Sequence, residues 1–179
     1  MIQLDRKEWI KRRFQIENRE DKEKAIVEKL LPFLKNKKNI GLYIPIRGDV
    51  DVYKACKQQQ IQNKTFKIFV PKVENDTEMN FYEDTNLEKG HFGILEPVEN
   101  TGISPKELDV IVVPVVAFKK LHRVGYGKGY YDRYLKKTSA LKIGVAFDCQ
   151  KADFQSNPWD VLLDVMISEN EVLEKKHEC

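Results

Sequence analysis

The stretch VVPVVAFKKLHRVGYGKGYYDRYL, residues 112–135, decides the fold of this chain. An apolar run at residues 110–113 predicts a buried strand, a glycine-rich segment predicts a loop, and residues 130–137 predict the start of a helix. Glycine lets backbone N–H groups approach an anion, and a helix N-terminus adds unpaired N–H groups and the positive end of a dipole. Because Arg123 and Lys128 add full positive charges, this order predicts a phosphate-binding loop, with a plain hairpin turn as the alternative.

The loop matches neither of the two familiar nucleotide-binding signatures. Its glycines, Gly125, Gly127 and Gly129, are spaced as G-x-G-x-G, whereas the dinucleotide fingerprint needs G-x-G-x-x-G. A P-loop follows its lysine with Ser or Thr, but Lys128 is followed by glycine. The flanking charges and the Tyr-Tyr-Asp at residues 130–132 favour a binding site, because a purely structural turn has little need for that chemistry.

Composition places the chain among ordinary globular proteins. With 179 residues, 41% hydrophobic and 33% charged, it is long enough for one domain with a sizeable core. No run approaches 18 apolar residues and the N-terminus lacks an apolar signal region, so we expect neither a membrane span nor secretion. The cysteines, Cys56, Cys149 and Cys179, suit neither a disulfide set nor a zinc site, which indicates a reducing cytoplasm.

The N-terminal segment, residues 1–38, is basic. It holds 12 Lys and Arg against 7 Asp and Glu, a balance that could attract nucleic acid, a membrane surface or a small polyanion. Its basic residues alternate with acidic ones, and pairs such as Glu20 and Lys24 stand four residues apart, as on a solvated helix face. We therefore predict no nucleic-acid partner and no membrane partner.

Apolar periodicity predicts most of the helices and strands. Residues 5–35 should form a helix that breaks near Asn18 and ends or kinks at Pro32. A further helix is expected at residues 51–60, and strands are expected at residues 40–44, 66–70, 109–113, 142–147 and 161–167. Residues 78–82 read as an edge strand, Pro71 as the stop of the strand before it, and residues 86–97 as a loop.

Apolar strands that alternate with helices predict the α/β class. We expect a single domain over residues 1–179, with a mainly parallel sheet and helices on both faces, a Rossmann-like three-layer sandwich. Residues 1–38 should pack on this domain as a basic helical segment, and residues 169–179 should be a frayed tail. Ligands bind beyond the carboxyl ends of such strands, so the loops after Ile44, Val113 and Phe147 should share one rim.

The glycine loop and its flanks resemble a known family. Gly125-Tyr-Gly-Lys-Gly-Tyr-Tyr-Asp-Arg-Tyr-Leu135, preceded by Pro114-x-x-Ala-Phe118 and Arg123, is similar to the signature of the 5-formyltetrahydrofolate cyclo-ligases, also called methenyltetrahydrofolate synthetases. Val115 and Val124 depart from the usual Gly and Leu. Further matches follow in order along nearly the whole chain: Pro71 to Phe81, Gly93-Ile-Leu-Glu-Pro97, Lys142 to Gln150, Pro158, and Asp160 to Asp164.

The resemblance implies a ligase of folate and one-carbon metabolism. It would use ATP and Mg²⁺ to convert 5-formyltetrahydrofolate, with or without a polyglutamate tail, into 5,10-methenyltetrahydrofolate, ADP and phosphate. Phosphorylation would turn the formyl oxygen into a good leaving group, and N10 would then close the ring. The resemblance also implies a cytoplasmic enzyme, which we expect to be monomeric. Another ATP-using kinase or ligase on a similar scaffold is the first alternative, and a basic nucleic-acid-binding module is the second.

The resemblance also implies roles for individual residues. Those implied for catalysis are Arg123 and Lys128, and those for ATP are Lys7, Lys11, Arg123, Gly125, Tyr126, Gly127, Lys128, Gly129, Tyr130, Tyr131 and Asp132. The folate would contact Asp49, Met79, Phe118, Tyr131 and Trp159, and Mg²⁺ would bind Asp132 and Asp164.

Several of these positions carry alternatives or depart from the family pattern. Lys7 and Lys11 stand where the family has Lys-x-x-Leu-Arg, and Arg12 could replace Lys11 by a shift of one residue. The family usually has Glu at the position of Asp49. Packing in the core is the alternative for the aromatic residues, a first-turn helix charge for Asp132, and a strand-end cap for Asp164.

Overall fold

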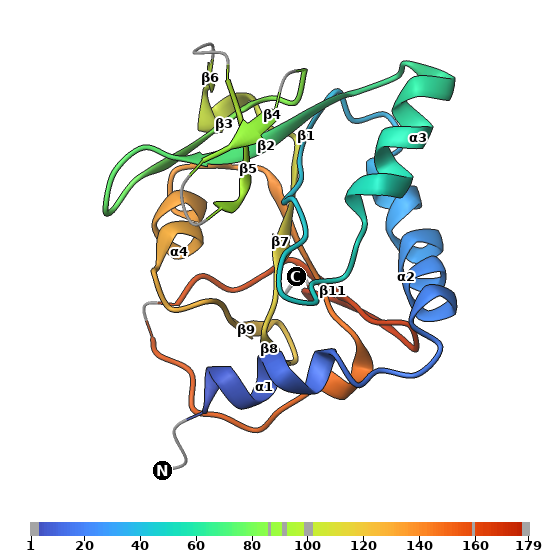
Figure 1. The fold of residues 1–179 in the computed structure, drawn as a ribbon, viewed down its shortest axis with the longest axis vertical. Helices are drawn as coiled ribbons and strands as arrows, with labels where there is room; N and C mark the ends of the chain where they lie inside the picture. The colour runs from blue at the N-terminus through green and yellow to red at the C-terminus, as the bar shows by residue number, and fades with distance from the viewer. Residues whose placement is uncertain (1–3, 86, 91–92, 99–101, 159, 177–179) are drawn as a thin grey trace.

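The chain folds around one eight-stranded sheet (Figure 1). The computed structural model describes residues 4–85, 87–90, 93–98, 102–158 and 160–176. Its helices are α1 (Arg6–Arg13), α2 (Arg19–Leu34), α3 (Tyr53–Asn63) and α4 (Tyr130–Leu135), with short 3-10 turns η2 (Pro105–Glu107) and η3 (Asp148–Gln150). Its strands are β1 (Asn39–Gly41), β2 (Lys67–Val73), β3 (Met79–Glu83), β4 (Leu87–Lys89), β5 (Leu95–Pro97), β6 (Gly102–Ile103), β7 (Val110–Pro114), β8 (Ala117–Lys119), β9 (His122–Val124), β10 (Leu141–Val145), β11 (Val165–Ile167) and β12 (Val172–Glu174).

The strand order confirms the mainly parallel sheet. In the order β12-β11-β10-β7-β1-β2-β3-β6, the five strands from β11 to β2 are parallel to their neighbours within that group. The strands outside this group, β12 on one side and β3 and β6 on the other, pair antiparallel. The prediction that residues 78–82 form an edge strand is wrong, because β6 pairs with β3 and takes the edge position.

Helices cover both faces of this sheet, as expected, and each face has its own core. One core packs the α2 side chains Ile26 and Leu30 and Cys56 of α3 against alternate strand residues such as Ile40. The other core packs Tyr134 and Leu135 of α4 against the opposite set of strand side chains. The strands are apolar on both faces because both faces are covered. In Figure 1, α2 and α3 lie on one side of the sheet, α4 on the other and α1 across one end.

The N-terminal helix breaks where the sequence predicts. Asn18 lies between α1 and α2 with φ of 53°, in the left-handed region that Asn tolerates better than most residues. Pro32 lies inside α2, and the helix ends two residues later at Leu34. No helix among the described residues is both long enough and apolar enough to span a membrane.

Several predicted ends of elements are wrong, including those of β1, which ends at Gly41, and β11, which begins at Val165. β2 continues through Pro71 to Val73, because β1 already ends at Gly41, opposite Phe69, so the missing N–H of proline breaks no ladder bond on that side. The expected frayed tail contains β12, whose Val172 and Glu174 pair with the two ends of β11. The tail is mostly charged, so this short strand gave no apolar pattern from which it could be predicted.

Two hairpins were also not predicted from the sequence. The expected loop at residues 86–97 contains β4 and β5, which pair with each other. Between β7 and the glycine loop, β8 and β9 form a second hairpin whose turn includes Lys120 with φ of 54°. Lysine is an unusual residue at a left-handed turn position, so no turn signal marked this hairpin. The glycine loop therefore follows β9 and not β7.

Candidate active site

A cavity of about 330 Å³ lies beyond the carboxyl ends of β1 and β7. The segment after β1 contributes Tyr43, Ile44, Ile46, Arg47 and Asp49, and the glycine loop with the start of α4 contributes residues 125–132. The remaining walls come from β2, β3 and β5 with its preceding residue Ile94, together with Pro114, Arg123 and Arg6 of α1. Two of the loops expected to share one rim therefore meet in one cavity. The loop after β10 adjoins them, because Gln150 donates a hydrogen bond to the carbonyl of Val115.

Arginine side chains hold the glycine loop by its carbonyl groups. Arg6 Nε donates to the Gly125 carbonyl at 3.0 Å, and Arg133 Nη2 donates to the Lys128 carbonyl at 2.9 Å. Gly127 and Gly129 have φ of 97° and 75°, which L side chains rarely adopt. A carbonyl and the next N–H point in opposite directions along one peptide plane, so these bonds turn N–H groups away from the arginines.

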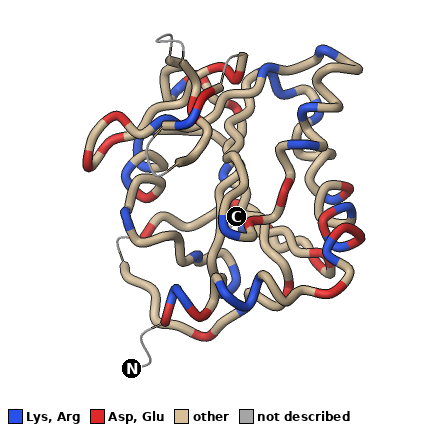
Figure 2. The backbone as a smooth tube through the Cα atoms, in the orientation of Figure 1, with Lys and Arg blue, Asp and Glu red and all other residues tan. Residues whose placement is uncertain are grey.

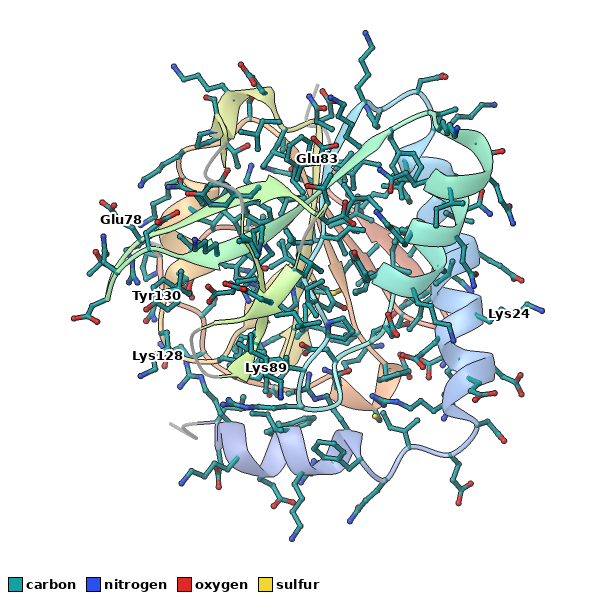
Figure 3. The ribbon with its side chains drawn as sticks, turned by 45° about the horizontal axis from the view of Figure 1, so that its top comes forward. Lys24, Glu78, Glu83, Lys89, Lys128 and Tyr130 are labelled. Carbon is teal, nitrogen blue, oxygen red and sulfur yellow. The ribbon has the colours of Figure 1, made fainter. Side chains whose placement is uncertain are left out.

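Three backbone N–H groups of this loop, those of Tyr126, Gly127 and Gly129, remain available for a ligand. Within the described residues, the backbone N–H groups of Tyr126, Gly127 and Gly129 donate no hydrogen bond to the protein. Exposed N–H groups in a glycine loop at a helix start form an anion-binding concavity. Figure 3 shows Lys128 and Tyr130 of this loop on the same side of the molecule. The geometry supports the predicted phosphate-binding loop.

A buried network lies beneath the loop. Arg13 Nη1 donates to Asp49 Oδ1 at 2.8 Å, and the Tyr126 hydroxyl donates to the same oxygen at 2.6 Å. Arg13 Nη2 donates to the Tyr126 hydroxyl at 2.7 Å, and the Ile46 N–H donates to Asp49 Oδ2 at 3.1 Å. Burial raises the pKa of Asp49, and the Arg13 charge opposes that shift. Burial and the nearby Asp49 carboxylate raise the pKa of the Tyr126 hydroxyl, so Tyr126 stays protonated and acts as the donor.

Arg123 lies behind the glycine loop. Its side chain is 5% exposed, and its Nη1 donates to the Pro114 carbonyl at 2.9 Å. Burial lowers the pKa of Arg123, and the carboxylates of Asp132 and Asp160 oppose that shift. A Cβ atom added at Gly125 would lie 2.6 Å from the guanidinium, so a larger residue there would displace the end of the buried Arg123 side chain. Arg123 thus supports the loop from behind, and its Nε has no hydrogen-bond partner among the described residues.

The rest of the cavity is an apolar slot with a few polar atoms. Its walls include Ile44, Val73, Met79 and the ring of Tyr131. The Tyr131 hydroxyl is buried and makes no hydrogen bond to any described residue. An apolar cleft with few polar groups is the usual form of a site for a flat heterocycle.

The structure brings most of the predicted residues together at this cavity. They are Asp49, Met79, Arg123 and all eight residues from Gly125 to Asp132. Phe118 is instead 1% exposed in the core beside α4, because β8 turns its side chain inward. Trp159 lies outside the described residues.

Lys7 and Lys11 do not line the cavity. Both are exposed on α1, and the neighbouring Arg12 contacts Glu8 and the Trp9 ring. The residues of α1 that reach the glycine loop are Arg6 and Arg13. Sequence reasoning missed these two, and the only available signal was the basic character of the segment.

Asp132 and Asp164 lie at opposite ends of the sheet. Asp164 directly precedes β11 and accepts a hydrogen bond from the Lys142 N–H at the start of β10, so it acts as a strand-end cap. Asp132 is at the mouth of the cavity with a side chain 47% exposed, and its nearest charged partner is Arg123 at 3.5 Å. The predicted pairing of these two carboxylates around one metal is therefore not what the geometry offers.

The carboxylates near the cavity fit a magnesium ion that shares its ligands with a phosphate. Among the described residues, no group of three or more His, Cys, Asp or Glu side chains could hold a metal by itself. Mg²⁺ is commonly held by one or two carboxylates together with substrate phosphates. Asp132 lines the cavity with an exposed side chain and could take this part, while Asp160 does not line the cavity but acts on the charge of Arg123.

Comparison with known proteins shows which proteins this chain resembles. Residues 5–169 match the model of the 5-formyltetrahydrofolate cyclo-ligase family. The chain is 38% identical over 151 residues to the 5-formyltetrahydrofolate cyclo-ligase of Mycoplasma genitalium, covering 81% of this chain and 82% of that protein. It is similar to the Aquifex aeolicus 5,10-methenyltetrahydrofolate synthetase structure, with TM-score 0.83, 34% identity, and coverage of 97% and 93%.

A second solved structure gives the same result. The 5,10-methenyltetrahydrofolate synthetase of Mycoplasma pneumoniae has TM-score 0.76 and 33% identity, covering 92% of this chain and 96% of that one. The chain belongs to the 5-formyltetrahydrofolate cyclo-ligase family.

Proposed function

We propose that this cavity converts 5-formyltetrahydrofolate and ATP into 5,10-methenyltetrahydrofolate, ADP and phosphate. The observation that carries the proposal is one cavity in which a glycine loop with available N–H groups faces an apolar slot. A reaction between a triphosphate and a flat heterocycle needs both binding surfaces within reach of each other. Membership of the family supplies the identity of the two substrates.

The ATP side of the reaction rests on the glycine loop. The N–H groups of Tyr126, Gly127 and Gly129 would bind phosphate oxygens, and the side chains of Arg6 and Lys128 would balance their charge. Phosphoryl transfer depends mostly on positioning and charge stabilisation. Arg123 would act by packing against Gly125, which keeps the loop in its binding conformation.

The folate side of the reaction rests on the apolar slot. The pterin would lie against the Tyr131 ring and Met79, with the formyl oxygen toward the glycine loop. That oxygen attacks the γ-phosphorus, and ADP leaves with the electrons of the broken P–O bond. N10 then attacks the formyl carbon, the N10 proton is lost, and inorganic phosphate departs with the former formyl oxygen. The slot holds N10 close to this carbon and limits access of water.

Magnesium fits the mouth of the same cavity. Bound between ATP phosphates and the protein, Mg²⁺ would neutralise the negative charge that builds up on the departing ADP. Asp132 would hold the ion. The surface of α1 and α2 does not favour a nucleic-acid partner, because acidic segments interrupt the basic ones along the two helices, mostly on α2 (Figure 2).

The test is a direct assay of the product. Purified protein is mixed with 5-formyltetrahydrofolate, ATP and Mg²⁺, and the absorbance of the methenyl product is followed, with a non-hydrolysable ATP analogue as the control. Growth of the band only with ATP and metal would support the proposal. A flat trace from folded protein that binds ATP would contradict it and favour another ATP-dependent ligase or kinase.

A further inference from the structure

Both oxygens of the Asp49 carboxylate already accept hydrogen bonds from the protein. Its side chain is 2% exposed, although the residue lines the cavity. Oδ1 accepts from Arg13 and from the Tyr126 hydroxyl, and Oδ2 accepts from the Ile46 N–H. Aspartate is one methylene shorter than glutamate, which draws the carboxylate back toward these donors and away from a ligand in the slot.

Tyr126 connects this carboxylate to the ATP site. Its backbone lies between Gly125 and Gly127, at the centre of the glycine loop, while its hydroxyl reaches down to Asp49 at 2.6 Å. The same hydroxyl accepts from Arg13 at 2.7 Å and lies 3.2 Å from the Ile46 carbonyl. Glycine-rich segments are conformationally free, so one fixed side chain in the middle of the loop restricts the whole loop.

We propose that Asp49 and Tyr126 form one positioning unit that sets the glycine loop for ATP, and that Asp49 is not a folate ligand. This inference rests on the proposed function for the identity of the two ligands. It predicts that loss of the Asp49–Tyr126 hydrogen bond weakens ATP binding and leaves folate recognition largely intact. The Asp49 carboxylate and the Tyr126 hydroxyl act through the conformation of the loop and not on the reacting atoms, so these two side chains have a positioning role.

The chain provides a matched control. Tyr53 donates to the buried carboxylate of Asp84 at 2.6 Å, the same distance as from Tyr126 to Asp49, and neither residue lines the cavity. Tyr53→Phe and Tyr126→Phe remove the same kind of hydrogen bond. A purely structural role for Tyr126 would therefore give the same result in both variants.

The experiment is a double-mutant cycle in which the affinity for ATP and the Michaelis constant for the folate are measured separately. Calorimetry measures the affinity for Mg-ATP, and turnover assays measure the Michaelis constant for the folate substrate, in Tyr126→Phe, Asp49→Asn, the double variant and Tyr53→Phe. We expect each of the first two variants to weaken ATP binding about tenfold, which is about 1.4 kcal/mol. The double variant should be no weaker than about tenfold, because both changes break one unit. The Michaelis constant for the folate should change less than about threefold, and Tyr53→Phe should bind ATP normally.

Three results would overturn the inference. These are weaker folate binding with unchanged ATP affinity in Asp49→Asn, additive losses near a hundredfold in the double variant, and equal ATP losses in Tyr126→Phe and Tyr53→Phe. If Asp49→Asn does not fold, the comparison of Tyr126→Phe with Tyr53→Phe decides the question alone. Wild-type protein that binds ATP without forming methenyl product would refute the proposed function, while the ATP affinities would still test the positioning unit.

Discussion

Arg13→Met should cost the protein about 3–5 kcal/mol of its free energy of unfolding. The Arg13 guanidinium is fully buried, and its two Nη atoms donate to the Asp49 carboxylate, the Tyr126 hydroxyl and two backbone carbonyls. Removing one partner of a buried ion pair leaves the other charge uncompensated, which typically costs that amount. Since a domain of this kind is stable by only about 5–15 kcal/mol, the loss is a large fraction of the total.

The neighbouring Arg12 is the control for this prediction. Its contact with Glu8 joins two side chains that are each 51% exposed, so Arg12→Met should change stability by less than about 0.5 kcal/mol. Both variants lose one positive charge from the same helix. Urea denaturation followed by circular dichroism measures both, with the slope m checked for constancy.

The comparison can refute the reasoning directly. Equal midpoints for Arg13→Met and Arg12→Met would show that burial and hydrogen bonding at Arg13 do not carry the assigned stability. If Arg13→Met fails to fold, Arg13→Lys replaces it and should fall between the wild type and full loss. Lysine keeps the charge but lacks the planar fork that reaches several acceptors at once.

Three further predictions concern the site and the cysteines. Lys128→Ala should weaken apparent ATP affinity at least about tenfold in turnover assays, by the loss of a charge-assisted phosphate contact; an unchanged affinity would remove Lys128 from the ATP site. Arg6→Ala should weaken ATP binding more than Lys7→Ala, because only Arg6 lines the cavity, and the reverse order in calorimetry would contradict the geometry. Burial raises the pKa of Cys56 from 9.0 to about 12, so Cys56 should resist iodoacetamide at about pH 8 while the exposed Cys149 reacts, as peptide mass mapping would show. The unfolded state loses its thiol proton first, so the raised pKa disfavours the folded state as pH rises above 9.0, and the contribution from the protonated thiol is fully lost once pH passes about 12.

The fold was largely predictable because its strands are apolar on both faces. Continuous apolar runs such as residues 110–113 and 143–147 are typical of strands in a sheet that is covered on both sides. The parts that were missed are short and depend on pairing partners elsewhere in the chain. β12 and β6 carry little apolar signal, and β2 passes through Pro71 only because β1 ends early.

The structure gathers the predicted residues at one cavity where a single segment supplies several of them. The glycine loop and the start of α4 are contiguous, so motif spacing places Gly125 to Asp132 together. Asp164 lies away from this cavity for the opposite reason. It directly precedes β11, at the amino end of that parallel strand, whereas the predicted strand began at residue 161 and so did not place Asp164 at that end.

The same reasoning explains why Arg6 and Arg13 were missed. Glycines at 127 and 129 permit the left-handed conformations that the loop needs, but each glycine costs about 0.5–1 kcal/mol more backbone entropy to order than alanine. A loop of this composition does not order itself, so other parts of the chain must fix it. Arg6, Arg13 and Arg133 do so through the Gly125 carbonyl, the Tyr126 hydroxyl and the Lys128 carbonyl.

Two of these three arginines come from α1, more than 100 residues before the loop. A glycine motif therefore predicts only which backbone conformations the loop can adopt. It does not predict which side chains hold the loop in one of them. Two of the side chains that hold the loop belong to α1, a short basic helix whose composition alone is typical of a solvated surface. The binding conformation of the loop thus depends on the packing of α1 against it, and a substitution in either segment should change ATP binding.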